Sequence, residues 1–272
     1  MADIKLIGLD LDGTLLTSNK TITAKTTLVL KQLHAKGYHI AIMTGRPIAA
    51  IGPFIEQLGL TGPEDYSLTF NGALVLNNVT RKSIAKLTTT KAALAPLHDW
   101  LKEHHYPMDI LDFDQNWQMA QMGERSVYAS IMKAPLLFEY VPFSALPDRH
   151  DYAKAVVATT QPRVDQLVDT LPTAIKAQFH IVRSQPQILE FLQPTLDKRV
   201  GVQALTEYFQ LTPENVMVFG DAENDLGMFD YAKYPVAMAN GTREAKAAAV
   251  YVTPTTNDED GIANFLTAYF KL

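Results

Sequence analysis

The sequence predicts an α/β fold: a doubly wound, mostly parallel sheet with an α+β module inserted into it. Strand-like and helix-like segments alternate over residues 3–70, and the same alternation returns near residue 188 and continues to the end of the chain. The stretch between them has a different pattern of short strands and helices. Alternating strands and helices are typical of a parallel sheet with helices on both faces.

The first part of the chain has the pattern of a βαβαβ unit. Apolar runs and helical spacing alternate, and Gly37 and Gly59 stand where the two helices should end. The expected elements are a strand at 3–9, a helix at 23–36, a strand at 38–43, a helix from Pro47 to about Leu58 and a strand at 67–70, followed by a turn at Asn71-Gly72.

The middle and last parts complete this organisation. For the middle part we expect helices at 90–104 and 162–171 and short strands or turns at 108–113, 117–122, 127–132, 153–159 and 179–182. For the last part we expect strands at 188–192, 215–219, 236–239 and 250–252 and helices at 197–209, 224–233, 242–249 and 259–270, the first of them capped by Asp197. The predicted domains are a core of residues 1–81 and 188–272 and an inserted α+β cap of residues 82–187.

Composition excludes several classes of protein. The 272 residues are 47% hydrophobic and 19% charged, as in ordinary globular proteins, and a net charge of −5 argues against a nucleic-acid partner. The chain has no cysteine, so disulfides, thiolate metal sites and cysteine nucleophiles are excluded. Charges interrupt every apolar run, including the first, so we expect no signal peptide, no membrane partner and a cytoplasmic protein. No feature indicates the oligomeric state.

Four polar segments stand at predicted junctions of the parallel-sheet domain. They are Asp10-Leu11-Asp12-Gly13-Thr14, Thr44-Gly45-Arg46, Asp197-Lys198 and Gly220-Asp221-Ala222-Glu223-Asn224-Asp225. Asp-Gly is also a common turn dipeptide, so Asp12-Gly13 alone could close a hairpin. However, the carboxyl ends of parallel strands share one edge of the sheet, where α/β proteins place their ligands. We therefore expect the four segments to converge there.

A group of aspartates at one edge predicts a metal site. Two carboxylates about 5 Å apart repel by roughly 3 kcal/mol at an effective dielectric constant of about 20. Asp10, Asp12, Asp221 and Asp225 would therefore need a cation or shifted protonation. Oxygen ligands without His or Cys favour Mg²⁺. Together with Lys198 and hydrogen-bond donors, such a site suits phosphoryl transfer. The expected donors are the Thr44 hydroxyl, the Asn224 amide and the backbone N–H groups near Leu11 and Gly45.

These four segments resemble, in order, the four motifs of the haloacid dehalogenase (HAD) superfamily of phosphohydrolases. The stretches Thr44-Gly45-Arg46-Pro47, Asn71-Gly72-Ala73, 236–240 and Asn257-Asp258-Glu259-Asp260-Gly261 resemble its Cof-type subfamily, which has a large inserted cap. The resemblance covers roughly residues 1–80 and 188–272, while the cap is similar only in size and pattern. It implies a Rossmann-like core and a Mg²⁺-dependent phosphatase.

The resemblance also implies a role for each motif residue. Asp10 is the nucleophile that forms an aspartyl-phosphate, and Asp12 is the general acid and base, which must hold a proton near neutral pH. The implied metal ligands are Asp10, the Asp12 carbonyl, Asp221 and Asp225. The implied phosphate-binding residues are Leu11, Thr44, Gly45, Lys198 and Asn224.

Some assignments have alternatives. Arg199 follows Lys198 where the family often has glycine, so in a shifted alignment Arg199 would take the lysine's role. Arg46 could contact substrate or be a solvent-exposed arginine at a helix start, and Asn71 could contact substrate or belong to a turn.

The expected substrate is a small phosphorylated metabolite, most simply a sugar phosphate, because an inserted cap of about 100 residues leaves little room for a folded protein. A phosphomutase of the same superfamily is one alternative. A phospho-accepting receiver protein is another, although Asp12 would promote loss of the stored phosphoryl group.

Overall fold

The computed structural model describes residues 3–132 and 137–272, and the chain divides into two compact units. The first unit comprises Met1–Lys86 and Asp197–Leu272, and the second comprises Leu87–Leu196. The second unit is thus an insertion in the first, as the change of sequence pattern indicates. Its limits differ from the expected 82 and 187 by several residues at each end.

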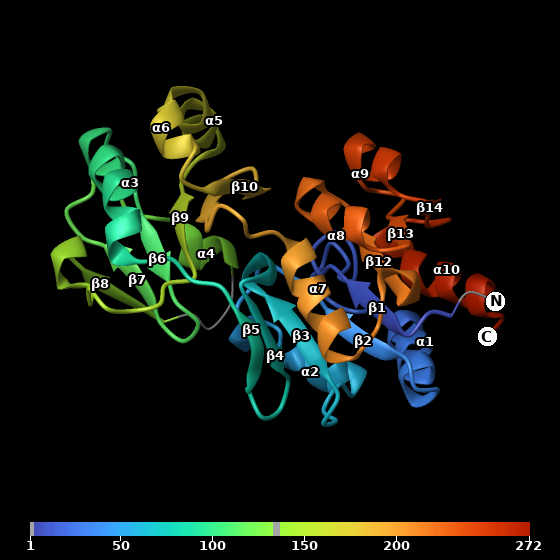
Figure 1. Ribbon diagram of the computed structural model, residues 1–272. Helices are drawn as coiled ribbons and strands as arrows, with labels where there is room; N and C mark the ends of the chain where they lie inside the picture. Colours follow the sequence, from blue (N-terminus) through green and yellow to red (C-terminus); the bar gives the residue numbers. More distant parts are fainter. Residues whose placement is uncertain (1–2, 133–136) are drawn as a thin grey trace. The chain divides into compact units, whose positions relative to one another are not determined.

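Of the described residues in the first unit, five strands form a parallel sheet with the order β14-β13-β12-β1-β2 (Figure 1). Strand β1 lies between two partners, since Leu6 pairs with Val216 on one side and with His39 on the other. All carboxyl ends therefore lie at one edge of this sheet. The strands are β1 (Leu6–Leu9), β2 (His39–Ile42), β12 (Val216–Gly220), β13 (Tyr234–Ala237) and β14 (Tyr251–Val252).

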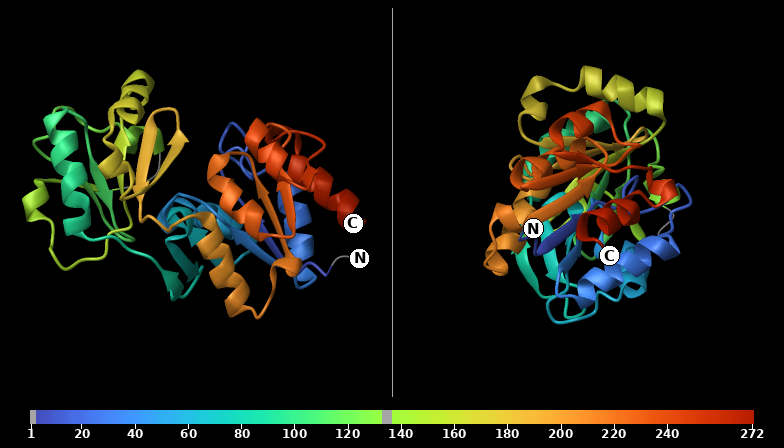
Figure 2. Two further views of the ribbon diagram at one scale, coloured as in Figure 1. Left: turned by 45° about the horizontal axis from the view of Figure 1, so that its top comes forward. Right: turned by 90° about the vertical axis from the view of Figure 1, so that its right-hand side faces the viewer.

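Helices cover both faces of this sheet, which confirms the doubly wound α/β fold (Figure 2). Ile7 and Leu9 of β1 belong to the apolar cluster that contains the first helical layer, whereas Leu6 belongs to the cluster of the second. Side chains that point to opposite faces of the strand thus pack into two separate apolar cores. The first layer is α1 (Ala24–Ala35), α2 (Gly52–Leu58) and α10 (Gly261–Phe270), and the second is α7 (Lys198–Tyr208), α8 (Leu226–Tyr231) and α9 (Arg243–Ala248).

Local capping explains where the helices beside the site begin. Asp197 caps α7 by accepting a 3.2 Å hydrogen bond from the backbone N–H of Val200, as its position in the sequence predicts. Thr23 caps α1 in the same way, accepting from Thr26 at 3.1 Å. Lys198 is therefore fixed at the first residue of its helix.

A small antiparallel sheet extends the first unit beyond β2. Its order is β3-β4-β5, and a parallel bridge between Met43 and Leu68 joins it to the residue after β2. The tight connection at Asn71-Gly72 is a 3-10 turn, and Asn71 has a positive φ of 57°. The strands are β3 (Tyr66–Thr69), β4 (Leu74–Asn77) and β5 (Ser83–Lys86), and the 3-10 turns of this unit are η1 (Ile48–Ala50), η2 (Phe70–Gly72), η4 (Pro213–Asn215), η5 (Glu223–Asp225) and η6 (Asn257–Glu259).

Among its described residues, the second unit has a six-stranded sheet with the order β10-β11-β9-β6-β7-β8. Only the β7–β8 pair of this sheet is parallel. One face packs against α3 and α5, where Leu97 and Leu167 meet Ile110 and Phe191 in a single apolar cluster. The elements are β6 (Asp109–Leu111), β7 (Asn116–Met119), β8 (Phe138–Val141), β9 (Lys154–Ala158), β10 (His180–Gln185), β11 (Ile188–Leu192), α3 (Lys91–Glu103), α4 (Tyr128–Met132), α5 (Gln161–Thr170), α6 (Thr173–Lys176) and η3 (Phe143–Ala145).

Two sequence-based assignments in this region are wrong. The segment 127–132, expected as a strand or turn, contains helix α4, because parallel strands β7 and β8 need a crossover between them. Strand 188–192, assigned to the core, pairs with β9 and β10 in the sheet of the second unit. An apolar run predicts a buried strand but does not say which sheet it joins.

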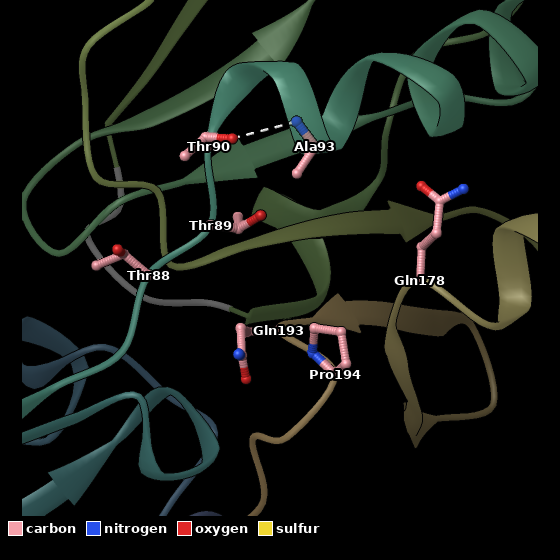
Figure 3. Close-up of a pocket in the computed structure, with 7 residues that line it drawn as sticks. All are labelled: Thr88, Thr89, Thr90, Ala93, Gln178, Gln193 and Pro194. Carbon is pink, nitrogen blue, oxygen red and sulfur yellow. Dashed lines mark hydrogen bonds between the residues drawn. The ribbon is translucent and has the colours of Figure 1, made fainter.

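The second unit also contains a pocket of about 400 Å³ (Figure 3). It is lined by Thr88, Thr89, Thr90, Ala93, Gln178, Gln193 and Pro194, and the Thr90 hydroxyl caps α3 by accepting from Ala93. None of the described residues that line it has an ionisable side chain, so these residues offer no acid or base. Over the described part of the chain, no helix has the length and apolar character that crossing a membrane requires.

Candidate active site

The carboxyl ends of β1 and β12 bring the first and last polar segments together. These strands pair in parallel up to Leu9 and Phe219, and the backbone N–H of Asp10 continues the ladder with a 2.9 Å hydrogen bond to the Phe219 carbonyl. Asp10 therefore follows β1 at the level where Gly220 ends β12 and Asp221 follows it. The sequence predicts that these two segments lie close together, and in the structure they do.

Three of the expected acids form a cluster at this edge. Asp10, Asp221 and Asp225 each offer a carboxylate oxygen, and these oxygens all lie within 4.8 Å of one another. Asp225 is fully buried, and its Oδ2 accepts hydrogen bonds from the backbone N–H groups of Asp221 at 2.9 Å and Ala222 at 3.2 Å. The turn η5 therefore fixes the position of this carboxylate.

Lys198 supplies a positive charge inside the cluster. Its side chain is fully buried, and its Nζ lies 2.5 Å from Oδ1 of Asp10 and 2.5 Å from Oδ1 of Asp225. By contrast, the exposed Arg199 forms an ion pair with Asp230. The geometry thus favours Lys198 over Arg199 for the role of the motif lysine.

Gly13 and Thr14 fit closely around Asp221. The backbone of Gly13 has a positive φ of 81°, and a Cβ atom there would lie 2.5 Å from Oδ2 of Asp221. Only glycine therefore fits without strain. The Thr14 hydroxyl donates a 2.8 Å hydrogen bond to Oδ1 of Asp221. The loop after β1 thus holds the carboxylate after β12.

Burial and mutual repulsion raise the pKa of two of these acids. The pKa of Asp10 lies well above its ordinary value, because burial and the charges of Asp225 and Asp221 outweigh the stabilising Lys198 ammonium. The pKa of Asp221 rises to about 6, again mainly through burial and the charge of Asp225. Burial alone would lower the pKa of Lys198, but the two adjacent carboxylates raise it. The cluster therefore holds more negative charge than one ammonium group balances.

Asp12 lies in a different environment from the one expected. Its half-exposed carboxylate accepts hydrogen bonds from Arg46 Nε at 2.8 Å, Arg46 Nη2 at 2.6 Å and Lys20 Nζ at 2.6 Å. Burial raises the pKa of Asp12, but these two cations outweigh it and bring the pKa below its ordinary value. The expectation that Asp12 holds a proton near neutral pH is not met in this arrangement.

The second motif lies next to the turn between β3 and β4. The Thr44 hydroxyl accepts a 3.1 Å hydrogen bond from the backbone N–H of Arg46, and the Thr44 carbonyl accepts a 3.0 Å bond from the backbone N–H of Asn71. A Cβ atom at Gly45 would lie 2.9 Å from the Asn71 amide oxygen. Thr44, Gly45, Arg46 and Asn71 therefore form one contiguous patch of the first unit.

Two further residues that were expected to bind phosphate, Leu11 and Asn224, differ from each other in burial. The Leu11 side chain is fully buried in the core, so only its backbone could face a ligand. Asn224 is half-buried in η5, one residue before Asp225.

The cluster has the donor chemistry of a hard divalent cation. Its ligands are carboxylate oxygens, which Mg²⁺ prefers, and three carboxylates outnumber the single ammonium group of Lys198. Asp10, Asp221 and Asp225 therefore fit a Mg²⁺ site. The Asp12 carboxylate does not belong to this group, so any contribution from Asp12 would come from its backbone carbonyl.

Sequence reasoning placed Thr14 in the first polar segment but gave it no role, and it did not include Lys20 in this region. Thr14 stands inside the first motif, so its position was the available signal. Lys20 lies in an exposed loop, eight residues after the aspartate that it contacts. Only the folded course of residues 13–21 brings it to Asp12.

A family model described as haloacid dehalogenase-like hydrolase matches residues 7–266. The chain belongs to this family. This confirms the resemblance drawn from the four motifs. As a member of the HAD superfamily, the protein is an enzyme of the phosphatase type.

Individual relatives agree with this assignment. The chain is 29% identical over 286 residues, or 98% of each protein, to the Bacillus subtilis 5-amino-6-(5-phospho-D-ribitylamino)uracil phosphatase YitU. It is 26% identical to a HAD-like hydrolase of known structure from Bacteroides thetaiotaomicron, with a TM-score of 0.85 over 98% of this chain and 100% of that one. The sugar phosphatase BT4131 of HAD subclass IIB shares the fold, with a TM-score of 0.82 at 24% identity over 98% of this chain and 100% of its own.

Proposed function

We propose that this HAD phosphatase is a Mg²⁺-dependent phosphomonoester hydrolase that uses Asp10 as nucleophile. The observation that carries the proposal is the placement of Asp10, whose carboxylate lies 2.5 Å from the buried Lys198 ammonium and has an oxygen within 4.8 Å of carboxylate oxygens of Asp221 and Asp225. A carboxylate at a strand end, facing a cation and further acids, is suited to attack phosphorus and not to stabilise a core.

The metal ligands in this proposal are Asp10, Asp221, Asp225 and the backbone carbonyl of Asp12. When bound, Mg²⁺ would orient the phosphoryl group and neutralise charge on its oxygens. Lys198, the Thr44 hydroxyl, the Asn224 amide and the backbone N–H groups of Leu11 and Gly45 are proposed to bind those same oxygens. Such donors stabilise a transition state that spreads charge over the phosphoryl oxygens.

The proposed reaction has two steps. First, an Asp10 carboxylate oxygen attacks phosphorus while the bond to the leaving oxygen breaks, and Asp12 gives its proton to that oxygen. Second, Asp12 takes a proton from water, which attacks phosphorus and releases inorganic phosphate from Asp10. In the structure Arg46 and Lys20 hold the Asp12 carboxylate, so Asp12 would have to leave these cations before it protonates the leaving group.

The proposed substrates are small phosphorylated metabolites, with sugar phosphates and related phosphorylated polyols first. Support comes from the names of two proteins that this chain resembles: the substrate named for YitU carries its phosphate on a ribityl chain, and BT4131 is named a sugar phosphatase. Arg46 and Asn71, which lie in one patch with Thr44, are proposed to contact the part of the substrate nearest the phosphate.

The decisive experiment replaces the nucleophile. The Asp10→Asn variant should release no phosphate from para-nitrophenyl phosphate, while circular dichroism shows an intact fold. As a matched control, Asp230→Asn removes an exposed acid of the same unit that pairs with Arg199, and it should keep wild-type turnover. Normal turnover by Asp10→Asn would remove Asp10 from its role.

Two further measurements test the metal and the reaction class. EDTA should abolish turnover, and added Mg²⁺ should restore it. Activity that persists in chelator would contradict the metal assignment.

A panel of about a hundred phosphorylated metabolites should yield free phosphate and the dephosphorylated alcohol. Formation of an isomeric phosphate with little free phosphate would instead identify a phosphomutase.

A further inference from the structure

Asp221 is the acid of the cluster that Lys198 holds least. The Lys198 ammonium lies 2.5 Å from a carboxylate oxygen of Asp10 and 2.5 Å from one of Asp225, and both of these acids are buried. Asp221 is half-buried, and among the described residues no cation forms an ion pair with it. One of its oxygens nevertheless lies within 4.8 Å of an oxygen of each of the other two acids. Carboxylates this close repel one another, so Asp221 would turn toward solvent unless another contact held it.

Thr14 provides this contact. Its hydroxyl donates a 2.8 Å hydrogen bond to Oδ1 of Asp221, and over residues 3–132 and 137–272 no other group donates a hydrogen bond to that carboxylate. Two further bonds involve only the main chain of Asp221: its N–H donates to the Asp225 carboxylate at 2.9 Å, and its carbonyl accepts from the N–H of Thr242 at 2.7 Å. They fix the backbone but leave the side chain free to rotate. The orientation of the Asp221 carboxylate therefore depends on the Thr14 hydroxyl.

Thr14 itself is held firmly. Its side chain is only 1% exposed. The next two residues, Leu15 and Leu16, lie in the apolar core, and their backbone N–H groups donate to the carbonyls of Asp10 at 3.2 Å and Leu11 at 2.8 Å. The main chain around Thr14 is thus tied directly to the end of β1. Because this hydroxyl cannot move with its acceptor, the hydrogen bond favours one orientation of the carboxylate that it contacts.

This hydrogen bond bears on metal binding because Asp221 is one of the proposed Mg²⁺ ligands. Carboxylates that bind metals are themselves hydrogen-bonded as a rule, and loss of such a partner weakens metal affinity. A carboxylate that is already oriented binds without first being moved against the repulsion of Asp10 and Asp225. Without the Thr14 hydroxyl, Asp221 would turn away while the metal is absent, and returning it would consume part of the binding free energy.

We propose that Thr14 is a positioning residue for Asp221, whose carboxylate it holds in the orientation that binds Mg²⁺. The inference rests on the proposed function, because Asp221 is a metal ligand only there. Thr14 acts through Asp221, since the single hydrogen of its hydroxyl is donated to that residue. Its loss should weaken the affinity for Mg²⁺ and leave turnover at saturating Mg²⁺ largely intact, because an excess of the metal restores the bound state by mass action.

The test compares variants with and without this hydroxyl. Thr14→Val and Thr14→Ala lack it, and valine keeps the shape of threonine, whereas Thr14→Ser retains it. The readout is the Kd for Mg²⁺, measured by calorimetric titration of the metal-free protein with MgCl₂ and no substrate, after circular dichroism has shown a native fold. We expect Kd to rise about 10–100-fold in Thr14→Val and Thr14→Ala. In Thr14→Ser it should stay within about threefold of the wild-type value, because the hydrogen bond remains.

Thr206→Val is the matched control. Thr206 is another fully buried threonine of the first unit, and its hydroxyl forms hydrogen bonds with the Gln203 carbonyl at 2.8 Å and the Tyr231 hydroxyl at 2.6 Å. It follows Lys198 by eight residues in α7, which is about 12 Å along the helix. This replacement therefore removes a buried hydroxyl of the same kind away from the acidic cluster. Its Kd for Mg²⁺ should equal that of the wild type.

Turnover supplies a second readout. With para-nitrophenyl phosphate, the Mg²⁺ concentration that gives half-maximal turnover should rise in Thr14→Val by about the same factor as Kd. Turnover at saturating Mg²⁺ should stay within about twofold of the wild-type value. A change that only destabilised the fold would instead lower turnover at every Mg²⁺ concentration.

Three results would overturn the inference. They are a Kd of Thr14→Val and Thr14→Ala within about threefold of wild type, an equal rise of Kd in Thr14→Ser or Thr206→Val, and a loss of turnover in Thr14→Val that saturating Mg²⁺ does not restore. A wild-type protein that binds Mg²⁺ but hydrolyses no phosphomonoester would contradict the proposed function, and the Kd values would still decide the role of Thr14. A wild-type protein that binds no Mg²⁺ would contradict the metal assignment and this inference together.

Discussion

Replacement of Asp109 by asparagine should change how the stability of the second unit depends on pH. Asp109 lies in β6 with no exposed surface, and its carboxylate accepts hydrogen bonds from the Ser126 hydroxyl and, at 3.4 Å, from the Gln118 amide. Burial raises the pKa of Asp109 to about 7, although both hydrogen bonds act in the opposite direction. No cation is among the groups that shift its pKa, so burial is only partly offset.

The direction in which stability changes with pH follows from the proton that Asp109 retains in the folded chain. Between about pH 4 and pH 7, folded Asp109 is protonated while the unfolded chain has lost the proton, so stability falls as pH rises and levels off above pH 7. A rise of the pKa from 3.8 to about 7 corresponds to about 4 kcal/mol at about 1.4 kcal/mol per pH unit. About 3 kcal/mol of this free energy of unfolding is lost between pH 5 and pH 8.

The assay is urea unfolding followed by tryptophan fluorescence at these two pH values. Both tryptophans of the chain, Trp100 and Trp117, lie in the second unit, so the signal reports on the unit that contains Asp109. Asp109→Asn should lose about 3 kcal/mol less free energy of unfolding than the wild type between pH 5 and pH 8. The exposed Asp148→Asn, in the same unit, should behave like the wild type. Equal losses in Asp109→Asn and wild type would refute the reasoning.

Two further predictions concern buried lysines. Lys198→Met leaves Asp10 and Asp225 without their ammonium partner, so the free energy of unfolding should fall by about 3–5 kcal/mol in urea titrations and phosphatase turnover should be lost; a variant as stable as wild type would contradict this. Lys154→Met leaves Glu190 buried without its 2.8 Å partner and should cost a similar amount. The double variant Lys154→Met with Glu190→Leu should recover most of that loss, and a double variant no more stable than the single one would show that loss of the Lys154–Glu190 ion pair is not the cause.

Much of the fold and the acidic cluster could be predicted from the sequence because both depend on strand ends. Apolar runs that stop at polar residues locate Asp10 and Asp221, and a parallel sheet brings such ends to one edge. Asp197 as a helix cap then places Lys198 beside them. Local sequence and one topological rule are enough for these residues.

The remainder depends on contacts between distant segments that no periodicity encodes. The ion pairs of Asp12 with Arg46 and Lys20 arise from the course of two loops, so the environment of Asp12 could not be foreseen. Strand β11 was assigned to the wrong unit because its buried residues would suit either sheet. The crossover helix α4 became necessary only because β8 pairs in parallel with β7, a pairing invisible in the sequence.

The insertion of one unit within the other sets a condition on how the protein is made. Strand β1 needs β12 as a neighbour, yet Leu6 and its partner Val216 are separated by the whole second unit. During synthesis on the ribosome, one edge of β1 therefore stays unpaired until the last quarter of the chain emerges. By then, all the strands of the sheet formed by residues 87–196 have been synthesised. Such a nascent chain exposes a strand edge open to wrong pairing, and its sheet closes late through a contact of high sequence separation.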